Sequence, residues 1–283
     1  TKKKMYHKQV YKLQNIIPID VLRLDDNKIE SILKKIQNSK SNNSLLGYAS
    51  ALEAICDYIR RTQYNVINAK VYSIIAISEA LNAQTKISLK KYFGIEPLSR
   101  YSNLENGIIA QQLPGLQDNF LINSASYYIE ILKMDSDEPA DYGKLGRIVI
   151  TDLYNYAQPL IRYDTGDIGA INEIDSNQYF TRIEGRKLDI IYNTKGEIVS
   201  SFLMYKNMWQ YTEIKQYQLI QKDKCEYLLK INVIHSFKKE NQLIKEFKSY
   251  LGEDAVFKIE YVDEIPLLAS GKRRKLINEY SHR

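Results

Sequence analysis

Apolar residues in the first third of the chain recur with the period of amphipathic helices. A first helix is predicted where apolar side chains follow the spacing i, i+3, i+4 and i+7, and Asp25 or Asp26 stands before it as a capping residue. The same spacing further along the chain predicts a second helix. The apolar positions are Ile29, Ile32, Leu33 and Ile36 in the first helix and Leu52, Ile55, Cys56 and Ile59 in the second.

The middle of the chain contains short apolar runs that predict β-strands, and one more amphipathic stretch that reaches about Phe93. Polar clusters at 39–44 and 135–141 are typical of loops. The predicted strands cover residues 71–77, 127–134, 145–151 and 167–174. Helices and strands mixed in this way indicate an α/β fold.

The order of the predicted elements changes after Gly185. Helix, strand, strand, helix and strand then follow one another, over residues 202–210, 214–220, 226–234, 236–250 and 255–262. A compact α+β unit of about a hundred residues can fold by itself. We therefore expect two units, residues 1–185 and residues 186–283.

Charge and cysteine content limit the class of protein. The 283 residues include 40 Lys and Arg against 34 Asp and Glu, and the net charge of +6 is far below that of a dedicated nucleic-acid binder. No apolar run approaches the roughly 18 residues of a membrane helix, so no membrane span is expected. Cys56 and Cys225 form neither a CxxC pair nor a disulfide framework, which is typical of a reducing compartment. Because residues 2–4 are lysines that lead into polar sequence, we expect no secretory signal and a cytoplasmic protein.

Three motifs contain candidate chemistry. Thr165-Gly166-Asp167 predicts a tight turn that directs a carboxylate outward before an apolar strand, and a carboxylate can accept two hydrogen bonds from a vicinal diol such as ribose. Gly185-Arg186 with Asp189 forms the second motif. Ser270-Gly271-Lys272 exposes a lysine that can act as a point charge on phosphate. Each motif taken alone also has a plain reading, as a hairpin turn, a solvated charge run and a basic tail.

In this order and spacing, the three motifs resemble those of the adenylate-forming superfamily of acyl-CoA synthetases. The chain looks most like the branch that holds phenylacetate-CoA ligases and the CapK-type proteins of capsular polysaccharide loci. Residues 163–167 resemble the ribose-binding motif, residues 185–189 the interdomain hinge and residues 270–272 the catalytic-lysine motif. Residues 143–151 and 101–105 resemble two further motifs of the family. The resemblance implies the C-terminal part of a large AMP-binding domain, made of β-sheets flanked by helices, followed by a small mobile α+β domain.

The resemblance also implies a two-step reaction and the roles of five residues. A small-molecule carboxylate attacks the α-phosphorus of ATP to give an acyl-adenylate and pyrophosphate, and CoA or an amine then displaces AMP. Lys272 is expected to stabilise the adenylation transition state, Asp167 to hold the ribose hydroxyls, and Arg186 to assist near the ribose and the hinge. Tyr101 is expected to pack on adenine, and Glu105 to approach Mg²⁺.

The sequence departs from the family pattern at several positions. The Ser/Thr/Gly-rich phosphate loop of the family has no counterpart before Tyr101, so the chain resembles an enzyme that lacks its N-terminal part. Ser102 replaces a glycine, Leu104 replaces a hydroxyl residue, and Leu188 stands where the hinge often has an acidic residue. These departures keep a second hypothesis open, a non-catalytic nucleotide-binding or assembly subunit that retains the fold. A nucleic-acid-binding module is disfavoured, because the 23 tyrosines are spread at strand and helix spacings and form no stacking platform.

Overall fold

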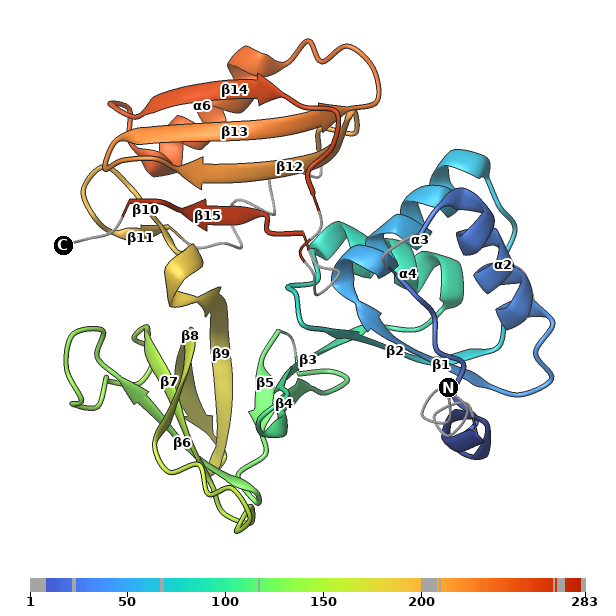
Figure 1. Ribbon diagram of the computed structural model, residues 1–283, viewed down its shortest axis with the longest axis horizontal. Coiled ribbons are helices and arrows are strands. Elements are labelled where there is room, and N and C mark those ends of the chain that lie inside the picture. Colours follow the sequence, from blue (N-terminus) through green and yellow to red (C-terminus); the bar gives the residue numbers. More distant parts are fainter. Residues whose placement is uncertain are drawn as a thin grey trace.

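The computed structural model describes residues 9–21, 24–66, 69–116, 118–199, 208, 210–266, 268 and 273–280. Within these ranges the chain forms a nine-stranded sheet, a four-stranded sheet and a short two-stranded pair (Figure 1). None of the helices in these ranges is long and apolar enough to cross a membrane. The α/β character expected from the sequence is confirmed.

Helices cover one face of parallel strands in the N-terminal part of the nine-stranded sheet. The elements are helix α2 (Asp26–Gln37), strand β1 (Asn43–Tyr48), helix α3 (Ala49–Thr62), strand β2 (Val71–Ile77), helix α4 (Ala83–Phe93) and strand β3 (Leu98–Asn103). Strand β2 pairs in parallel with both β1 and β3, as helical crossovers require. We call this part the N-terminal layer. Both predicted helices and the strand 71–77 are confirmed, whereas the predicted loop 39–44 is wrong at its end, because β1 begins at Asn43.

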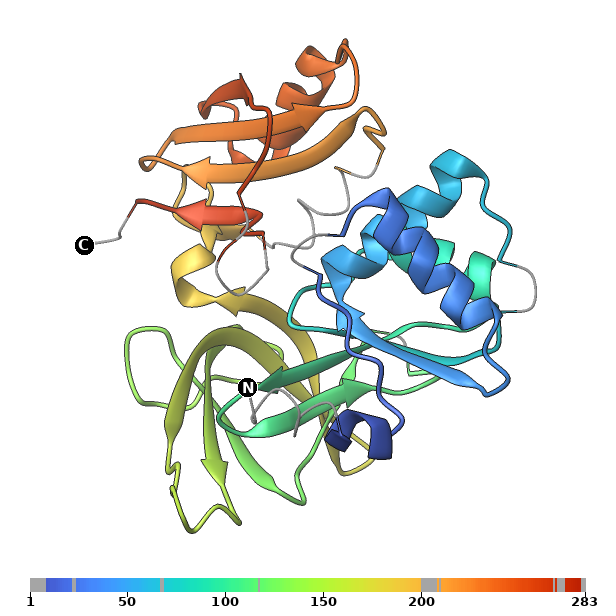
Figure 2. The ribbon, with the colours of Figure 1, turned by 45° about the vertical axis from the view of Figure 1, so that its right-hand side comes forward.

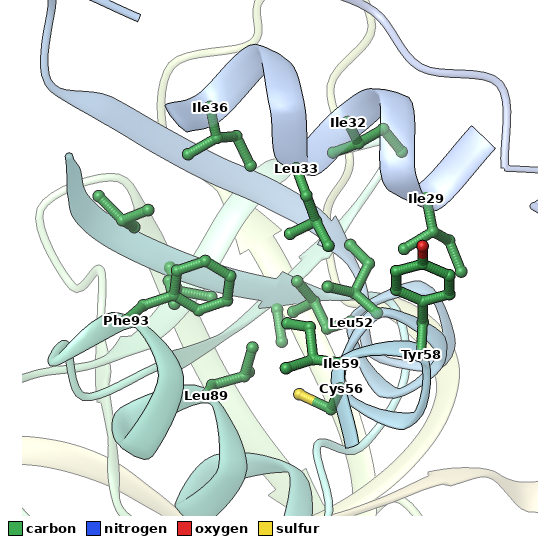
Figure 3. Close-up of a cluster of buried hydrophobic side chains, with 14 of the residues drawn as sticks. Ile29, Ile32, Leu33, Ile36, Leu52, Cys56, Tyr58, Ile59, Leu89 and Phe93 are labelled. Carbon is green, nitrogen blue, oxygen red and sulfur yellow. The ribbon is translucent and has the colours of Figure 1, made fainter. Parts of the chain in front are cut away.

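The core of the N-terminal layer explains why its helices form. Asp25 accepts a hydrogen bond from the backbone N–H of Lys28 at 2.8 Å and so caps α2, as one of the two predicted candidates. Apolar side chains from α2, α3 and α4 point toward one another and toward the strands (Figure 3). Full burial of one such side chain contributes roughly 1.5–3 kcal/mol. Cys56 belongs to this core, and its burial raises the pKa of the thiol to about 12.

The rest of the nine-stranded sheet is antiparallel. Its strands are β4 (Gly107–Gln112), β5 (Phe120–Ile122), β6 (Tyr127–Leu132), β7 (Gly146–Asp152), β8 (Tyr163–Ile174) and β9 (Asn177–Arg186). The spatial order of the whole sheet is β1-β2-β3-β4-β5-β9-β8-β7-β6. In this order β4, β5 and β9 stand between β3 and β8, the strand that contains the ribose-type motif. The predicted strands at 127–134, 145–151 and 167–174 are confirmed within a few residues, apart from β8, which begins four residues earlier than predicted.

The C-terminal residues form a four-stranded sheet with a helix packed on it. The elements are the short helix η1 (Lys187–Asp189), strands β10 (Ile191–Tyr192), β11 (Ile198–Val199), β12 (Ile214–Gln221) and β13 (Glu226–Val233), helix α6 (Glu240–Leu251), and strands β14 (Val256–Tyr261) and β15 (Leu276–Asn278). The sheet order is β14-β13-β12-β15, and α6 contributes Leu243, Phe247 and Leu251 to its core. We call this sheet with α6 the small sheet unit.

Most of the predicted elements of this unit are present. The strands predicted at 214–220, 226–234 and 255–262 are confirmed. The helix predicted from residue 236 begins at Glu240, and β15 was not predicted. The helix predicted at 202–210 lies almost wholly outside the described residues. In sequence order, β9 is the last strand of the nine-stranded sheet, and it ends at Arg186. The division into units between residues 185 and 186 stays a prediction.

Candidate functional site

The ribose-type motif lies inside strand β8, so the predicted tight turn before the strand is wrong. Gly166 has a φ of 74°, and the register of β8 against β7 shifts at this point, which is the pattern of a β-bulge. The Thr165 hydroxyl donates to the backbone carbonyl of Ile148 at 2.9 Å and accepts from the backbone N–H of Asp167 at 3.1 Å. The bulge and these two hydrogen bonds fix the backbone that holds Asp167.

Three of the residues predicted for the nucleotide site meet at the Asp167 carboxylate. Tyr101 from β3 donates its hydroxyl to Oδ2 at 2.7 Å, and Nε of Arg186 from the end of β9 lies 3.4 Å from Oδ1. The Asp167 side chain is 16% exposed, whereas that of Arg186 is 68% exposed. The carboxylate is therefore largely shielded and held by a half-buried donor, while the cation faces solvent.

Tyr101 is a half-buried residue that donates a hydrogen bond to Asp167. Its ring packs edge-on against Phe180, with the centroids 5.6 Å apart. Burial raises the pKa of the Tyr101 phenol far above its ordinary value, and the negative charge of Asp167 raises it further. The phenol is consequently protonated and donates to Asp167. Packing of Tyr101 on adenine stays a prediction. No sequence pattern indicated its contact with Asp167.

A cleft of about 570 Å³ opens beside the motif. It is lined by Met134, Asp135, Ser136, Asp137, Arg147, Asp164, Gly166, Arg186 and Lys187. Arg147 pairs with Asp164 at 2.6 Å and with Asp137 at 2.7 Å, so it joins the loop after β6 to strand β8. Arg186 and Lys187 supply positive charge to the same cleft. Arg147 was not singled out from the sequence, although it is part of the 143–151 match.

Glu105 lies in the turn that joins β3 to β4 and is exposed. The Asn103 side chain supports this turn by accepting from the backbone N–H of Asn106 at 2.7 Å. Across the described ranges, no group of three or more His, Cys, Asp and Glu could hold a metal ion. One exposed carboxylate is too few for a metal site made of protein groups alone. One or two carboxylates are enough for Mg²⁺ when substrate phosphates supply other ligands. The role of Glu105 stays a prediction.

Lys272 and the two residues before it lie outside the described residues, but the segment around them is anchored on both sides. Arg273 donates to the backbone carbonyl of Ile265 and to the Glu264 carboxylate, both at 2.9 Å. The backbone N–H of Ile265 in turn donates to the side chain of Gln216 in β12 at 2.8 Å. The two ends of the segment that contains Lys272 are thus joined to each other and to the small sheet unit.

The next two cations are also paired, each with a different part of the molecule. Arg274 forms an ion pair with Asp189 of η1, within the hinge-type motif. Lys275 Nζ lies 3.1 Å from Oε2 of Glu53 in α3. The reading of residues 273–275 as a solvated basic tail is therefore wrong. The sequence offered no signal for either partner, because the contacts join residues 85 and 222 positions apart.

Comparison with known proteins places this geometry in a family context. Residues 191–279 match the CapK C-terminal domain. The chain is 24% identical over 276 residues to protein CapK of Staphylococcus aureus, and the match covers 93% of this chain and 59% of CapK. The chain thus spans about three-fifths of the length of this curated relative.

Solved structures of CoA ligases share the fold. 2-Hydroxyisobutyryl-CoA ligase in the postadenylation state, in complex with R3-HIB-AMP, has a TM-score of 0.71 at 16% identity, over 91% of this chain and 58% of the ligase. The anthranilate CoA ligase AuaEII in complex with anthranoyl-AMP has a TM-score of 0.67 at 17% identity, over 91% of this chain and 52% of AuaEII. The chain is therefore similar to CapK in sequence and shares its fold with these CoA ligases.

Proposed function

We propose that the chain is the nucleotide-binding C-terminal part of an enzyme that adenylates a carboxylate and transfers the acyl group to CoA or an amine. The observation that supports this most is the convergence of Tyr101 and Arg186 on the Asp167 carboxylate. The two similar ligases are solved with acyl-AMP compounds, which agrees with a nucleotide site in this fold. The acyl substrate and the final acceptor stay open in this proposal.

Asp167 is the residue that we assign to the ribose hydroxyls. Tyr101 orients the carboxylate from one side through a part-buried hydrogen bond of 2.7 Å. The contact with Arg186 is long, at 3.4 Å, and the arginine is mostly exposed, so a ribose hydroxyl can replace it at small cost. Arg186 then stays close to the nucleotide, where its charge favours an anionic ligand.

Lys272 is the residue that we assign to catalysis. Two anions, the carboxylate and the α-phosphate, must approach each other, and a positive charge at the reacting oxygens offsets the negative charge that develops in the transition state. Bound Mg²⁺ would neutralise phosphate charge in such a site, with Glu105 as its predicted ligand.

The division into residues 1–185 and a mobile unit of residues 186–283 belongs to the same proposal, as does a location in the cytoplasm.

Activity requires more than these 283 residues in this proposal. The sequence contains no Ser/Thr/Gly-rich loop that could wrap the β- and γ-phosphates. The chain also spans only 59% of CapK. We therefore infer that adenylation needs the segment that corresponds to the rest of a CapK-length protein, and that the 283 residues alone bind nucleotide without turning it over.

A non-catalytic nucleotide-binding or assembly subunit is the second candidate function. It is favoured by Leu104, which is fully exposed at the position where the family pattern has a hydroxyl residue. An apolar side chain there can neither donate to nor accept from a phosphate. Both candidates require the same ribose site, and they differ in what Lys272 does.

The ribose site is tested by calorimetric titration of the chain with AMP. Replacing Asp167 by Ala removes a charged acceptor, so affinity should fall by roughly 1–3 kcal/mol, about 5- to 150-fold. Glu173→Ala is the matched control, because it removes the same charge from an exposed position of the same strand. Equal affinity in Asp167→Ala and Glu173→Ala would contradict the assignment.

A further inference from the structure

Lys275, which follows the lysine motif, joins the small sheet unit to the N-terminal layer. Lys275 Nζ lies 3.1 Å from Oε2 of Glu53, and the two side chains are 24% and 35% exposed. The same ammonium group lies 5.3 Å from the centre of the Tyr217 ring. Such a position over an aromatic ring favours a cation and restricts its direction. The partly shielded ammonium group therefore has partners on both sides of the junction, Glu53 in the N-terminal layer and Tyr217 in the small sheet unit.

Both ends of this ion pair belong to firmly held backbone. The carbonyl of Lys275 accepts from the backbone N–H of Leu219 at 2.9 Å, and that of Arg274 accepts from the Gln218 side chain at 2.7 Å. Lys275 consequently moves with strand β12 of the small sheet unit. Glu53 lies on α3, which contributes several side chains to the core of the N-terminal layer. β15, which starts directly after Lys275, begins on the side that faces the N-terminal layer (Figures 1 and 2).

The neighbouring residue extends the same connection to the hinge-type motif. Arg274 pairs with Asp189 in η1, the short helix between the nine-stranded sheet and the small sheet unit. Arg273 joins the two ends of the segment that contains Lys272. Three consecutive cations therefore make three different connections. Arg273 joins the two ends of the segment, Arg274 joins it to the hinge-type motif, and Lys275 joins it to the N-terminal layer. Rotation of the small sheet unit away from the N-terminal layer would therefore break the Glu53–Lys275 pair.

We propose that Glu53 and Lys275 are positioning residues that form a latch, which holds the small sheet unit, with the segment that contains Lys272, in one orientation against the N-terminal layer. The latch itself rests on the ion pair, and only its bearing on Lys272 rests on the proposed function. Partly exposed ion pairs are weak, so this latch is reversible. Loss of the latch should raise the population of molecules in which the small sheet unit has turned away, relative to the held orientation, by about two- to five-fold.

The latch can be tested in the 283-residue chain by the distance between two nitroxide spin labels. Cys225, half-buried between β12 and β13, is a natural label site on the small sheet unit. Lys35→Cys places the second label on the exposed face of α2 in the N-terminal layer. Cys56 does not react, because it is buried and the pKa of its thiol is raised to about 12. Failure to label Cys56 also shows that each variant is folded.

The expected result is one dominant distance in the parent, and a second population that grows about two- to five-fold in both Glu53→Gln and Lys275→Gln. The combined exchange Glu53→Lys with Lys275→Glu should restore part of the parent distribution, because it keeps the ion pair but loses the cation over the Tyr217 ring. Loss of packing alone would give no restoration. Lys222→Gln is the control, because it breaks the Lys222–Glu279 pair at 2.7 Å within the small sheet unit. Identical distributions in all variants would overturn the latch, while leaving the AMP titration, and hence the proposed function, untouched.

Discussion

Asp167 is a carboxylate whose two oxygens are held by groups from different strands. Tyr101 reaches one oxygen from β3, and Arg186 reaches the other from the end of β9. Loss of hydration and the nearby negative charge of Asp167 raise the pKa of the Tyr101 phenol, so it stays a donor at neutral pH. The carboxylate is therefore oriented before any ligand arrives. Such preorganisation lowers the conformational entropy that is lost when a ligand binds.

The identity of these three residues could be predicted from the motifs, whereas their contacts could not. Tyr101 and Asp167 are 66 positions apart and lie on strands β3 and β8, which are not neighbours in the sheet, so no local pattern reports their contact. The local structure predicted for Thr165-Gly166-Asp167, a tight turn before the strand, was also wrong. Gly and Asp favour turns, but here the positive φ of Gly166 forms a bulge within a continuous strand.

Loss of the Tyr101 hydroxyl should destabilise the protein. Tyr101→Phe keeps the ring against Phe180 but leaves a shielded carboxylate without its closest donor, so unfolding should cost roughly 1–3 kcal/mol less. Urea denaturation followed by circular dichroism measures this change. Tyr128→Phe is the control, because Tyr128 is exposed on β6 and should change stability by less than about 0.5 kcal/mol. Equal midpoints for the two variants would show that the Tyr101–Asp167 bond contributes nothing.

At the scale of elements, those with a clear apolar period were predicted best. Helices α2 and α3 have their apolar residues mainly on one face, and β2 is apolar at every position except Ser73, so the sequence alone located them. Strands β1 and β3 were missed because they mix Asn, Ser and Arg with apolar residues and are only half-buried. Strand β15 has three residues and is fixed by its parallel pairing with β12, which no local pattern reports.

Strand β7 depends on a glycine for its approach to β6. A Cβ at Gly146 would lie 2.2 Å from the backbone carbonyl oxygen of Leu132, and a carbonyl in a paired strand cannot move aside cheaply. Gly146→Ala should therefore lower the free energy of unfolding by roughly 1–3 kcal/mol. Thermal unfolding measures the effect.

Gly47→Ala in β1 is the matched control for this substitution. Nothing lies within 4 Å of a Cβ at Gly47, so stability should stay within about 0.5 kcal/mol of the parent. If Gly146→Ala unfolded at the same temperature as Gly47→Ala, the strands β6 and β7 would have to be farther apart than in this structure.

At the scale of the whole molecule, charged residues near Lys272 connect parts that are distant in sequence. Composition alone suggests that residues 272–275 are interchangeable surface cations. In the fold, Arg274 and Lys275 have separate partners in the hinge-type motif and in the N-terminal layer. Lys275 is for that reason unsuitable as a neutral control for Lys272, since its removal would disturb the orientation of the small sheet unit as well as the charge.

Lys272→Ala distinguishes the enzyme from the non-catalytic subunit. The assay is pyrophosphate release by the chain joined to the segment that corresponds to the rest of a CapK-length protein. A contact made chiefly in the transition state changes rate more than binding, so release should fall about 10²–10³-fold while AMP affinity changes little. Lys222→Ala is the control, because Lys222 pairs with Glu279 on an exposed surface. Equal release by the two variants would leave Lys272 without a catalytic role and favour the binding subunit.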